Sequence, residues 1–515
     1  MSIRTFAAIA VGSFELTMKI FEFSGKNSMR EIDCVSRRLA LGSDTYAHGR
    51  ICNEKLDEIC RTLKEFSGIM KAYKAEAYKA YGTSAIREAE NSIIVQDQIA
   101  QRTGIRIEIL SNSEQRFLDY KSVASRGESF RRIIEEKTAI LDIGGGSIQI
   151  SLFDNDTLVS TQNLRLGVLL IQEYMTRFEV KRSRMEYIID EMAMAQLANY
   201  KKLYLKDREI QNLIVIDNYI SPLAVKLTAG NPGKAMVNRE VFEGYVEQLR
   251  IESPAQVAKT LSMPEEKVPL AFISAVLTGR IADLMGAKQI WTPGVTLCDG
   301  IAYEYAEKIK MFRGEHDFEK DIIACAVNIS KRYMGSRKRS ETLENITATI
   351  FDSMKKVHGL GKRDLLYLKL AAILHDCGKY ISMVNIGETS YDIIMATEII
   401  GLSHAEREIV ANIVRFNHGR FVYNGQQGSR GLDKETYLKV AKLTAILRLS
   451  SGLDRSHKQK MKGMKAVLKD NQLFLTVDTA EDITLEKGFF KEREEFFREV
   501  FSVEPILKQK KALQM

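Results

Sequence analysis

The chain has 515 residues, of which 45% are hydrophobic and 28% charged, the composition of a soluble protein with roughly two to four domains. Lysine and arginine outnumber aspartate and glutamate by 75 to 67, and the formal charge of +8 favours anionic ligands without requiring a nucleic acid. The six cysteines form no CxxC pair, so we expect a cytoplasmic protein with neither zinc knuckles nor disulfides. No apolar run approaches the roughly 20 residues of a membrane span, and we expect neither a membrane nor a nucleic acid as a partner.

Strand-like and helix-like segments alternate from residue 3 to about residue 125, which is the pattern of an α/β domain. The same strand-turn-strand-strand order then returns about 130 residues later with TAILDIGG, SIQISLFD and TLVSTQNLRL. An internal duplication on this scale predicts two similar α/β lobes, residues 1–125 and 126–308, that face each other across a cleft.

Strand signals stop near residue 310, and apolar residues then recur at helical spacing. This periodicity predicts an all-helical domain over residues 309–460. Two short strands and a helix follow, so we expect a small α+β segment over residues 461–515.

The second repeat contains the turn DIGGGS, residues 142–147, directly after an apolar strand. Consecutive glycines allow the backbone N–H groups of a tight turn to point at one anion, and Asp142 would hold a phosphate-bound Mg²⁺. Such a turn, taken alone, is equally typical of a purely structural turn. The residues expected to bind phosphate here are Gly144, Gly145, Gly146 and Ser147.

Two further segments carry groups that favour an anion. Gly12 and Ser13 occupy the matching turn of the first repeat, so the two turns would hold a polyphosphate from both walls of the cleft. In YGTSAIREAEN, Thr83 and Ser84 stand between a strand and a helix, where hydroxyl groups and the helix dipole attract an anion. Arg87 lies one turn into that helix, within reach of the same anion. An ordinary helix cap with a surface arginine would have the same sequence.

Five segments occur in the order, and near the spacings, of one family: AIAVGS, YGTSAIREAEN, ILSNSEQRFLDY, ILDIGGGS and NLRLG. In these segments the chain resembles the exopolyphosphatase and guanosine pentaphosphate phosphohydrolase (Ppx/GppA) family. The resemblance implies an α/β duplicated actin-like (ribonuclease H-like) two-lobe fold. It also implies release of the terminal phosphate from inorganic polyphosphate or from guanosine pentaphosphate, usually with Mg²⁺. The partners that it implies are polyphosphate or a guanosine penta- or tetraphosphate, and a second copy of the chain in a homodimer.

Four positions depart from the family pattern in the direction of less negative charge or less room. Ala10 stands where members commonly have an aspartate in the first turn, and Gln149 replaces an acid after DIGGGS. The segment 217–219, Asp-Asn-Tyr, stands in place of a Gly-Gly-Thr turn. Gln115 occupies the position of the carboxylate that is thought to activate water in the family.

Glutamine cannot accept a proton, although it can orient a water molecule. We therefore expect Asp142 to hold the metal, and Glu114 with Gln115 to position or activate water. Glu114 and Glu15 are the candidates for a displaced carboxylate. Without such a carboxylate, the protein would be a catalytically silent receptor that binds polyphosphate or a guanosine alarmone and signals through its helical domain. A further alternative is a scaffold that no longer binds this ligand.

The helical region contains LHDCGKY, residues 374–380, which resembles the HD superfamily of metal phosphohydrolases. His375, Asp376 and Asp454 are the candidate metal ligands. Thr342 stands where an earlier histidine ligand would be expected, so we predict a structural HD-like domain rather than a second active site. Two basic runs, residues 331–339 and 454–465, would either flank a channel for a long polyanion or be solvated helix ends.

Overall fold

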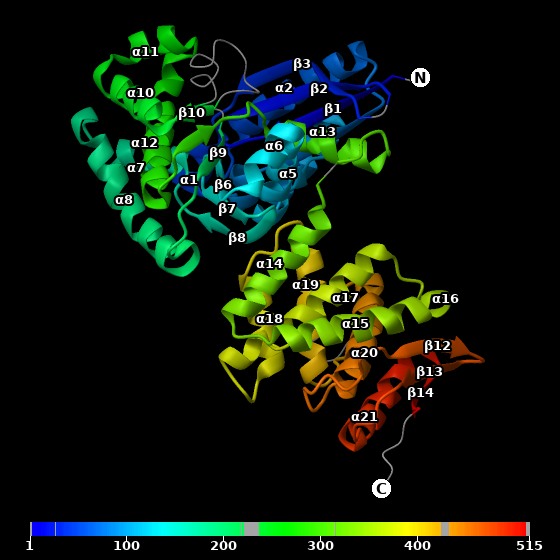
Figure 1. Ribbon diagram of the computed structural model, residues 1–515. Helices are drawn as coiled ribbons and strands as arrows, with labels where there is room; N and C mark the ends of the chain where they lie inside the picture. Colours follow the sequence, from blue (N-terminus) through cyan, green and yellow to red (C-terminus); the bar gives the residue numbers. More distant parts are fainter. Residues whose placement is uncertain are drawn as a thin grey trace. The chain divides into compact units, whose positions relative to one another are not determined.

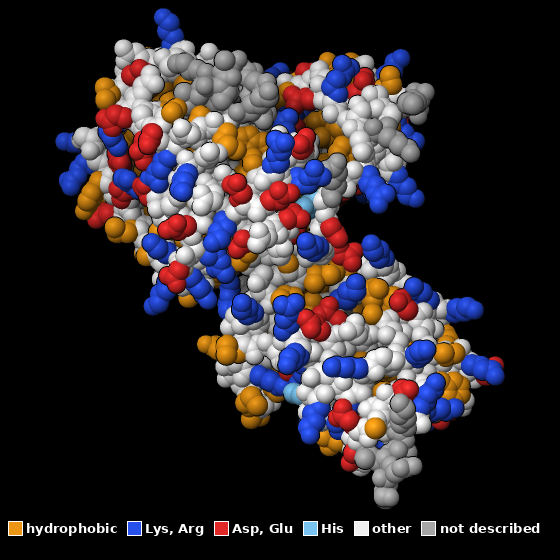
Figure 2. All heavy atoms as spheres, in the orientation of Figure 1, with side chains coloured by type: hydrophobic (Ala, Val, Ile, Leu, Met, Phe, Trp, Pro, Cys, Tyr) orange, Lys and Arg blue, Asp and Glu red, His pale blue; other side chains and the backbone are white. Residues whose placement is uncertain are grey.

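The computed structural model describes the chain in six stretches: residues 3–25, 27–217, 219–220, 236–314, 316–423 and 432–510. Asn218, the middle residue of the segment that stands in place of the family's Gly-Gly-Thr turn, lies outside these residues. The chain forms two compact units, Met1–Phe318 and Glu319–Met515 (Figure 1). Basic and acidic side chains are interspersed over the face shown in Figure 2, as the modest net charge predicts.

The first unit begins with a five-stranded sheet in the order β3-β2-β1-β4-β5. Its strands are β1 (Arg4–Val11), β2 (Glu15–Phe23), β3 (Met29–Arg38), β4 (Ala77–Gly82) and β5 (Glu108–Ile109). β1 pairs antiparallel with β2 and parallel with β4, with Val11 opposite Gly82. Because parallel strands end at the same edge of a sheet, the turn after β1 and the segment after β4 lie side by side.

A six-stranded sheet repeats this arrangement in the order β10-β11-β9-β6-β7-β8. Its strands are β6 (Thr138–Ile143), β7 (Ile148–Asp154), β8 (Thr157–Leu164), β9 (Asn212–Ile216), β10 (Met236–Asn238) and β11 (Gln289–Trp291). β6 pairs antiparallel with β7 and parallel with β9, as β1 does with β2 and β4. The duplicated α/β fold expected from the sequence is confirmed.

The helices of this unit flank the two sheets (Figure 1). They are α1 (Leu41–His48), α2 (Asn53–Ala72), α3 (Ser84–Glu88), α4 (Ser92–Thr103), α5 (Asn112–Ala124), α6 (Glu128–Glu135), α7 (Val168–Arg177), α8 (Met185–Tyr200), α10 (Arg239–Ile251), α11 (Pro254–Leu261), α12 (Val268–Met285) and α13 (Leu297–Lys308). Short turns of 3-10 or π helix cover Arg182–Arg184, Lys201–Leu205 and Glu265–Lys267.

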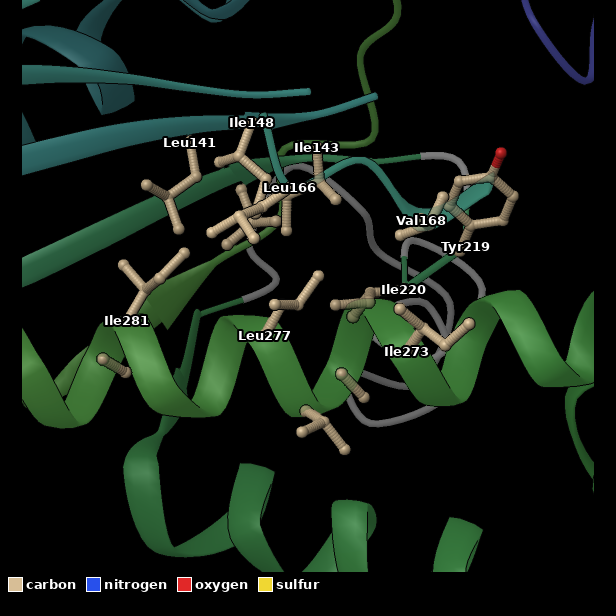
Figure 3. Close-up of a cluster of buried hydrophobic side chains, with 14 of the residues drawn as sticks. Leu141, Ile143, Ile148, Leu166, Val168, Tyr219, Ile220, Ile273, Leu277 and Ile281 are labelled. Atoms are coloured by element: carbon tan, nitrogen blue, oxygen red, sulfur yellow. The ribbon is translucent and has the colours of Figure 1, made fainter. Parts of the chain in front are cut away.

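α12 packs under the six-stranded sheet, with Ile273, Leu277 and Ile281 on the side that faces the sheet residues Leu141 and Ile148 (Figure 3). The helical stretch Glu265–Met285 is long and apolar enough to cross a membrane, but 67% of its most apolar window is buried inside the unit. Its apolar composition therefore belongs to a core helix, which is hydrophobic on all sides.

α13 follows the six-stranded sheet in the chain but packs on the five-stranded one. Cys298 and Ile301 share a buried cluster with Phe6 of β1 and Leu118 of α5. A Cβ atom at Gly300 would lie 2.0 Å from the backbone oxygen of Leu118, so only glycine permits this approach of α13 to α5. α13 thus fixes the helix that carries Gln115.

The second unit is helical apart from a small sheet. Its helices are α14 (Phe318–Arg332), α15 (Arg337–Ser353), α16 (Lys355–His358), α17 (Lys362–Leu374), α18 (Ile386–Ala396), α19 (His404–His418), α20 (Lys434–Leu453) and α21 (Thr484–Phe501), with a 3-10 turn at Cys377–Tyr380. The strands β12 (Lys465–Lys469), β13 (Gln472–Val477) and β14 (Glu504–Gln509) form one sheet in that order. β12 and β13 are antiparallel, whereas β13 and β14 are parallel and joined through α21. The helical region and the small α+β end expected from the sequence are both present.

Candidate active site

A cavity of about 490 Å³ in the first unit brings together residues from both sheets. Of the residues predicted from sequence, the cavity is lined by Gly12, Ser13, Thr83, Ser84, Gln115, Asp142, Gly144 and Gly145. The other four, Arg87, Glu114, Gly146 and Ser147, lie outside its lining. The convergence follows from topology, because these segments follow β1, β4 and β6 at the ends of parallel strands.

The two glycine turns have the same hydrogen bonding and lie against each other. The Gly12 N–H donates to the backbone oxygen of Glu15 at 3.0 Å, and the Gly144 N–H donates to the backbone oxygen of Ser147 at 2.9 Å. A Cβ atom at Gly145 would lie 2.7 Å from the Cβ of Ser13. Glycine at this position therefore permits the close approach of the two walls.

Three hydroxyl groups meet beside these turns. The Ser13 Oγ, Ser84 Oγ and Tyr46 Oη atoms lie 3.0 Å from one another in each pair. Burial raises the pKa of the Tyr46 phenol, so the group remains a hydroxyl at neutral pH. A hydroxyl can rotate to donate or accept, and such a cluster can present donors to the oxygens of one anion. Tyr46, on α1, is a site residue that sequence reasoning missed.

Arg87 acts on the cavity through its charge. Its Nη1 atom donates to the backbone oxygen of Leu110 at 2.7 Å, which holds the guanidinium in place. Its positive charge is one of the influences that lower the pKa of Asp142. Arg87 therefore stabilises negative charge in the cavity even though it does not line it.

The acidic part of the cavity contains Asp142, Gln115 and Asp119. The Gln115 Nε2 atom donates to Asp142 Oδ2 at 3.1 Å. Asp119 lies one helical turn after Gln115 on α5, and this spacing puts both side chains on one helix face. The Gln115 Oε1 and Asp119 Oδ2 atoms are buried and have no hydrogen-bond partner. Asp119 also hydrogen-bonds to Asp142 and Gln115, so the three side chains form one buried cluster.

Burial governs the electrostatics of this pair of aspartates. Burial raises the pKa of Asp119 well above its ordinary value, and the neighbouring Asp142 raises it further. Burial also raises the pKa of Asp142, while Asp119, Gln115 and Arg116 oppose the rise. Two carboxyl groups in this position share one proton, which a bound cation would displace.

The substitution at Gln149 is explained by the buried Arg116 of α5. The Arg116 Nε atom donates to Gln149 Oε1 at 2.9 Å, and its guanidinium also bonds to Thr161. A carboxylate at position 149 would neutralise this arginine. With glutamine there, the positive charge of Arg116 acts on Asp119 and Asp142 instead.

The two displaced carboxylates expected from sequence have other partners. Glu114 Oε2 accepts hydrogen bonds from the Ser111 N–H at 2.9 Å and the Ser111 Oγ at 2.6 Å, so it closes the capping box that begins α5. Glu15 lines the cavity, but its Oε2 atom lies 2.7 Å from Lys267 Nζ in an ion pair.

Asp217, at the end of β9, adds a buried carboxyl group to the cavity. It accepts hydrogen bonds from the Ser274 hydroxyl and the Tyr219 N–H. Burial raises its pKa to about 7, against the opposing effect of these hydrogen bonds. The carboxyl of Asp217 is therefore largely neutral below pH 7.

The donor atoms beside Asp142 fit a magnesium ion. Mg²⁺ prefers hard oxygen ligands, keeps several waters and commonly binds through one or two carboxylates. The Asp142 carboxylate and the unpartnered Gln115 Oε1 atom meet this requirement. Within the described ranges, no three His, Cys, Asp or Glu side chains form a group that could hold a metal ion.

The sequence profile described as the Ppx/GppA phosphatase family matches residues 23–308, and the profile of Ppx/GppA phosphatase domain III matches residues 324–493. The chain belongs to the Ppx/GppA phosphatase family. The second glycine turn, residues 142–147, lies within the residues that the family profile matches, whereas the first, at Gly12 and Ser13, precedes them. Of the carboxyl groups that line the cavity, only that of Glu15 precedes the matched residues.

Several relatives of this Ppx/GppA protein are known. A guanosine-5'-triphosphate,3'-diphosphate pyrophosphatase from Vibrio vulnificus is 21% identical over 461 residues, 86% of each chain. Exopolyphosphatase 1 from Mycobacterium bovis is 26% identical over 263 residues, 50% of this chain and 68% of the relative. The crystal structure of an exopolyphosphatase from Cytophaga hutchinsonii matches with a TM-score of 0.51 at 18% identity, covering 60% of this chain and all of the other, and it supports the actin-like fold.

In the second unit of this Ppx/GppA protein, the three HD-like residues come together around an arginine. His375 and Asp376 follow α17, and Asp454 follows α20. Arg339 of α15 lies between the two carboxylates, with Nη1 2.5 Å from Asp376 Oδ2 and Nε 4.0 Å from Asp454 Oδ2. All four side chains are at most 10% exposed.

Arg339 supplies positive charge among the residues that the resemblance to the HD superfamily predicts to be metal ligands. Burial alone would raise the pKa of Asp376, but His375, Arg339 and Lys379 hold it well below its usual range. The hydroxyl of Thr342, the residue at the position of the expected histidine ligand, donates to the backbone oxygen of Lys338. The expected metal ligands His375, Asp376 and Asp454 therefore form an ion-paired cluster with Arg339, which agrees with a structural role.

Proposed function

We propose that this phosphatase-family protein releases the terminal phosphate from inorganic polyphosphate or from guanosine pentaphosphate, with Mg²⁺ as the cofactor. The observation that carries the proposal is the cavity lined by the two glycine turns, the Ser13 and Ser84 hydroxyls and the Asp142–Gln115 pair, with the Tyr46 hydroxyl hydrogen-bonded to both serines. The names of the two relatives, an exopolyphosphatase and a guanosine-5'-triphosphate,3'-diphosphate pyrophosphatase, support polyphosphate or a guanosine polyphosphate as the substrate class.

The residues of the cavity divide the work between binding and charge stabilisation. Ser13, Ser84 and Tyr46 would donate hydroxyl hydrogens to the oxygens of the terminal phosphate, with Thr83 and the N–H groups of the turns beside them. Arg87 and Arg116 would offset the negative charge that develops there.

Asp142 and the Gln115 amide oxygen would hold Mg²⁺, which neutralises phosphate charge when it is bound. The membership of the phosphatase family and the Asp142 carboxylate in the cavity favour a hydrolase over a silent receptor.

We also propose that the protein works as a cytoplasmic homodimer. The family resemblance and the absence of a CxxC pair support this assignment. Light scattering on the purified protein would measure the mass, and a monomer at micromolar concentration would contradict the dimer.

The test is phosphate release from long-chain polyphosphate and from guanosine pentaphosphate, with Mg²⁺ and with EDTA. We expect metal-dependent release from at least one of the two, reduced about 100-fold or more in Asp142→Asn. Asp97→Asn, at an exposed position on α4, is the matched control and should retain the activity. Absence of release from both substrates, in a protein that binds them, would overturn the proposal in favour of a receptor.

A further inference from the structure

A second cavity, of about 530 Å³, lies in the second unit, between α15 and the loop of residues 459–464 that precedes β12. Its volume falls in the range of about 300–1,000 Å³ that is typical of pockets for small molecules. The two basic runs of the sequence both reach it, since Lys338 and Lys462 contribute to its lining. The runs that the proposed hydrolysis leaves without a role therefore meet at one place.

The loop runs beside α15 in the same direction as the helix. At one end, Asp454 accepts a hydrogen bond from the Gln459 N–H at 3.0 Å, and its carboxylate lies 4.0 Å from Arg339 in the first turn of α15. At the other end, the hydroxyl of Ser353, the last residue of α15, donates to the backbone oxygen of Ala466 in β12 at 2.9 Å. The cavity is therefore a groove that follows the helix axis.

The floor of this groove is apolar. Ile346, Met461 and Met464 line it and are otherwise buried. Methionine side chains are flexible and polarizable, and their sulfur atoms make favourable contacts with aromatic rings. The floor therefore suits a planar ring. It suits a chain of phosphates poorly, because a long polyanion is bound by cations along its whole length.

Amide groups lie beside the apolar floor. Asn345 and Gln459 both contribute to the lining. The Gln459 Nε2 atom donates to the backbone oxygen of His457, which fixes the amide and leaves its oxygen as an acceptor. A carboxamide offers a donor and an acceptor side by side, the pattern with which asparagine and glutamine bind the edge of a purine.

Two positive charges remain available at the groove. Lys338 and Lys462 are exposed, and in the described part of the chain neither forms an ion pair. Of the described residues that line the groove, only Glu341 is acidic, and it is paired with Arg337 at 2.7 Å. The groove therefore carries a net positive charge, which favours an anion.

We propose that the groove binds a purine nucleotide. The planar base lies on the apolar floor, where the amides of Asn345 and Gln459 bind its edge. Lys338 and Lys462 bind the phosphate. A nucleoside lacks the anion that the lysines bind, and inorganic polyphosphate lacks the ring that the floor binds, whereas a nucleotide combines both groups. The site belongs to the second unit and does not depend on the reaction proposed for the first.

The first experiment titrates the full-length protein with AMP and with GMP in a calorimeter, beside adenosine and inorganic phosphate. We expect saturable binding of at least one monophosphate, with adenosine and phosphate at least about 10-fold weaker. Lys462→Ala should weaken the binding about 10-fold or more, because it removes a charged hydrogen-bond donor. Lys356→Ala, at an exposed lysine of α16 outside the groove, is the matched control and should bind as the wild type does.

Photolabelling of the wild-type protein locates the bound nucleotide without relying on any variant. The 8-azido derivative of the monophosphate that binds should label residues 338–349 or 459–464, and the unmodified nucleotide should compete. Absence of saturable binding of both monophosphates would overturn the proposal, as would labelling confined to other parts of the chain or equal weakening in Lys462→Ala and Lys356→Ala. Binding of polyphosphate that Lys462→Ala abolishes, in a protein that binds neither monophosphate, would assign the groove to a polyanion instead.

Discussion

The cavity of the first unit and the HD-like cluster of the second both gather buried aspartates at the ends of helices and strands, yet they use positive charge differently. In the cavity, the Nε atom of the buried Arg116 bonds to Gln149, and Asp119 and Asp142 line the open volume. In the cluster, Arg339 lies directly between Asp376 and Asp454. The comparison teaches that motif residues alone do not define a site, because the placement of one cation decides whether the carboxylates are free to bind a ligand.

The largest effect should come from removing the cation of the second cluster. Arg339→Met removes the guanidinium from between the buried Asp376 and Asp454, of which Asp376 keeps only its pairs with His375 and Lys379, and we expect the second unit to lose about 3–5 kcal/mol of stability. Thermal unfolding would measure the loss. Arg337→Met, at a position 84% exposed on the same helix, is the control and should change little. If EDTA lowers the melting temperature of the wild-type second unit, a metal rather than Arg339 balances the cluster.

The next effect concerns Asp217, whose pKa of about 7 in the folded protein exceeds its ordinary value near 4. Between pH 4 and 7 the folded state keeps a proton that the unfolded state releases, so the wild type loses stability as pH rises through this window, by up to about 4 kcal/mol. Asp217→Asn does not titrate and should gain stability relative to the wild type as the pH is raised from 5 to 7.5. Denaturant unfolding at both pH values would measure this. A pH-independent difference between the two proteins would show that Asp217 ionises normally.

A smaller effect is expected from forcing apart the two turns of the cavity. In Gly145→Ala, the new methyl group would meet Ser13 Cβ at 2.7 Å and Leu169 Cδ1 at 2.8 Å, so the walls must separate. We expect kcat/KM to fall about 100-fold, the cost of a small misplacement in an active site. Gly244→Ala in α10 has no atom within 4 Å of the added methyl and should leave kinetics unchanged. Unaltered kinetics in Gly145→Ala would mean that the contact between the turns does not matter for turnover.

The smallest effect should follow from Tyr46→Phe, which removes one of the three converging hydroxyls. The ring still fills its place beside Gly146, so we expect kcat/KM to fall only about 10-fold, the value of one hydrogen bond to a charged group. Phosphate-release kinetics would measure it. Tyr187→Phe, at an exposed tyrosine on α8, should be silent. An equal loss in both variants would exclude a specific role for Tyr46.

Much of the fold could be predicted from the sequence because its signals are local. Apolar strands followed by Gly-Ser turns repeat in the two halves. Parallel pairing then brings Gly12 beside Thr83 at the edge of one sheet and Asp142 beside Ile216 at the edge of the other. The helical periodicity after residue 310 likewise depends only on spacing. These features need no knowledge of distant contacts.

The remaining site residues depend on tertiary contacts that no local pattern reports. Tyr46 lies in a short helix and joins the cavity only through its contacts with Ser13 and Ser84. Arg339 lies in a basic run that looks solvated, yet it is buried by α17 and α20. Asp119 did leave a signal, the four-residue spacing from Gln115, but its burial and its unpartnered oxygen became visible only in the folded chain.

The return of α13 to the five-stranded sheet has a mechanical consequence. The chain passes between the two sheets twice, once after α5 and once before α13. Asp119 lies on α5, which packs on α13 and the first sheet, whereas Asp142 lies on β6 of the second sheet. Two connections therefore tie the walls of the cavity together, and the distance between these two carboxyl groups depends on how the two sheets are held against each other.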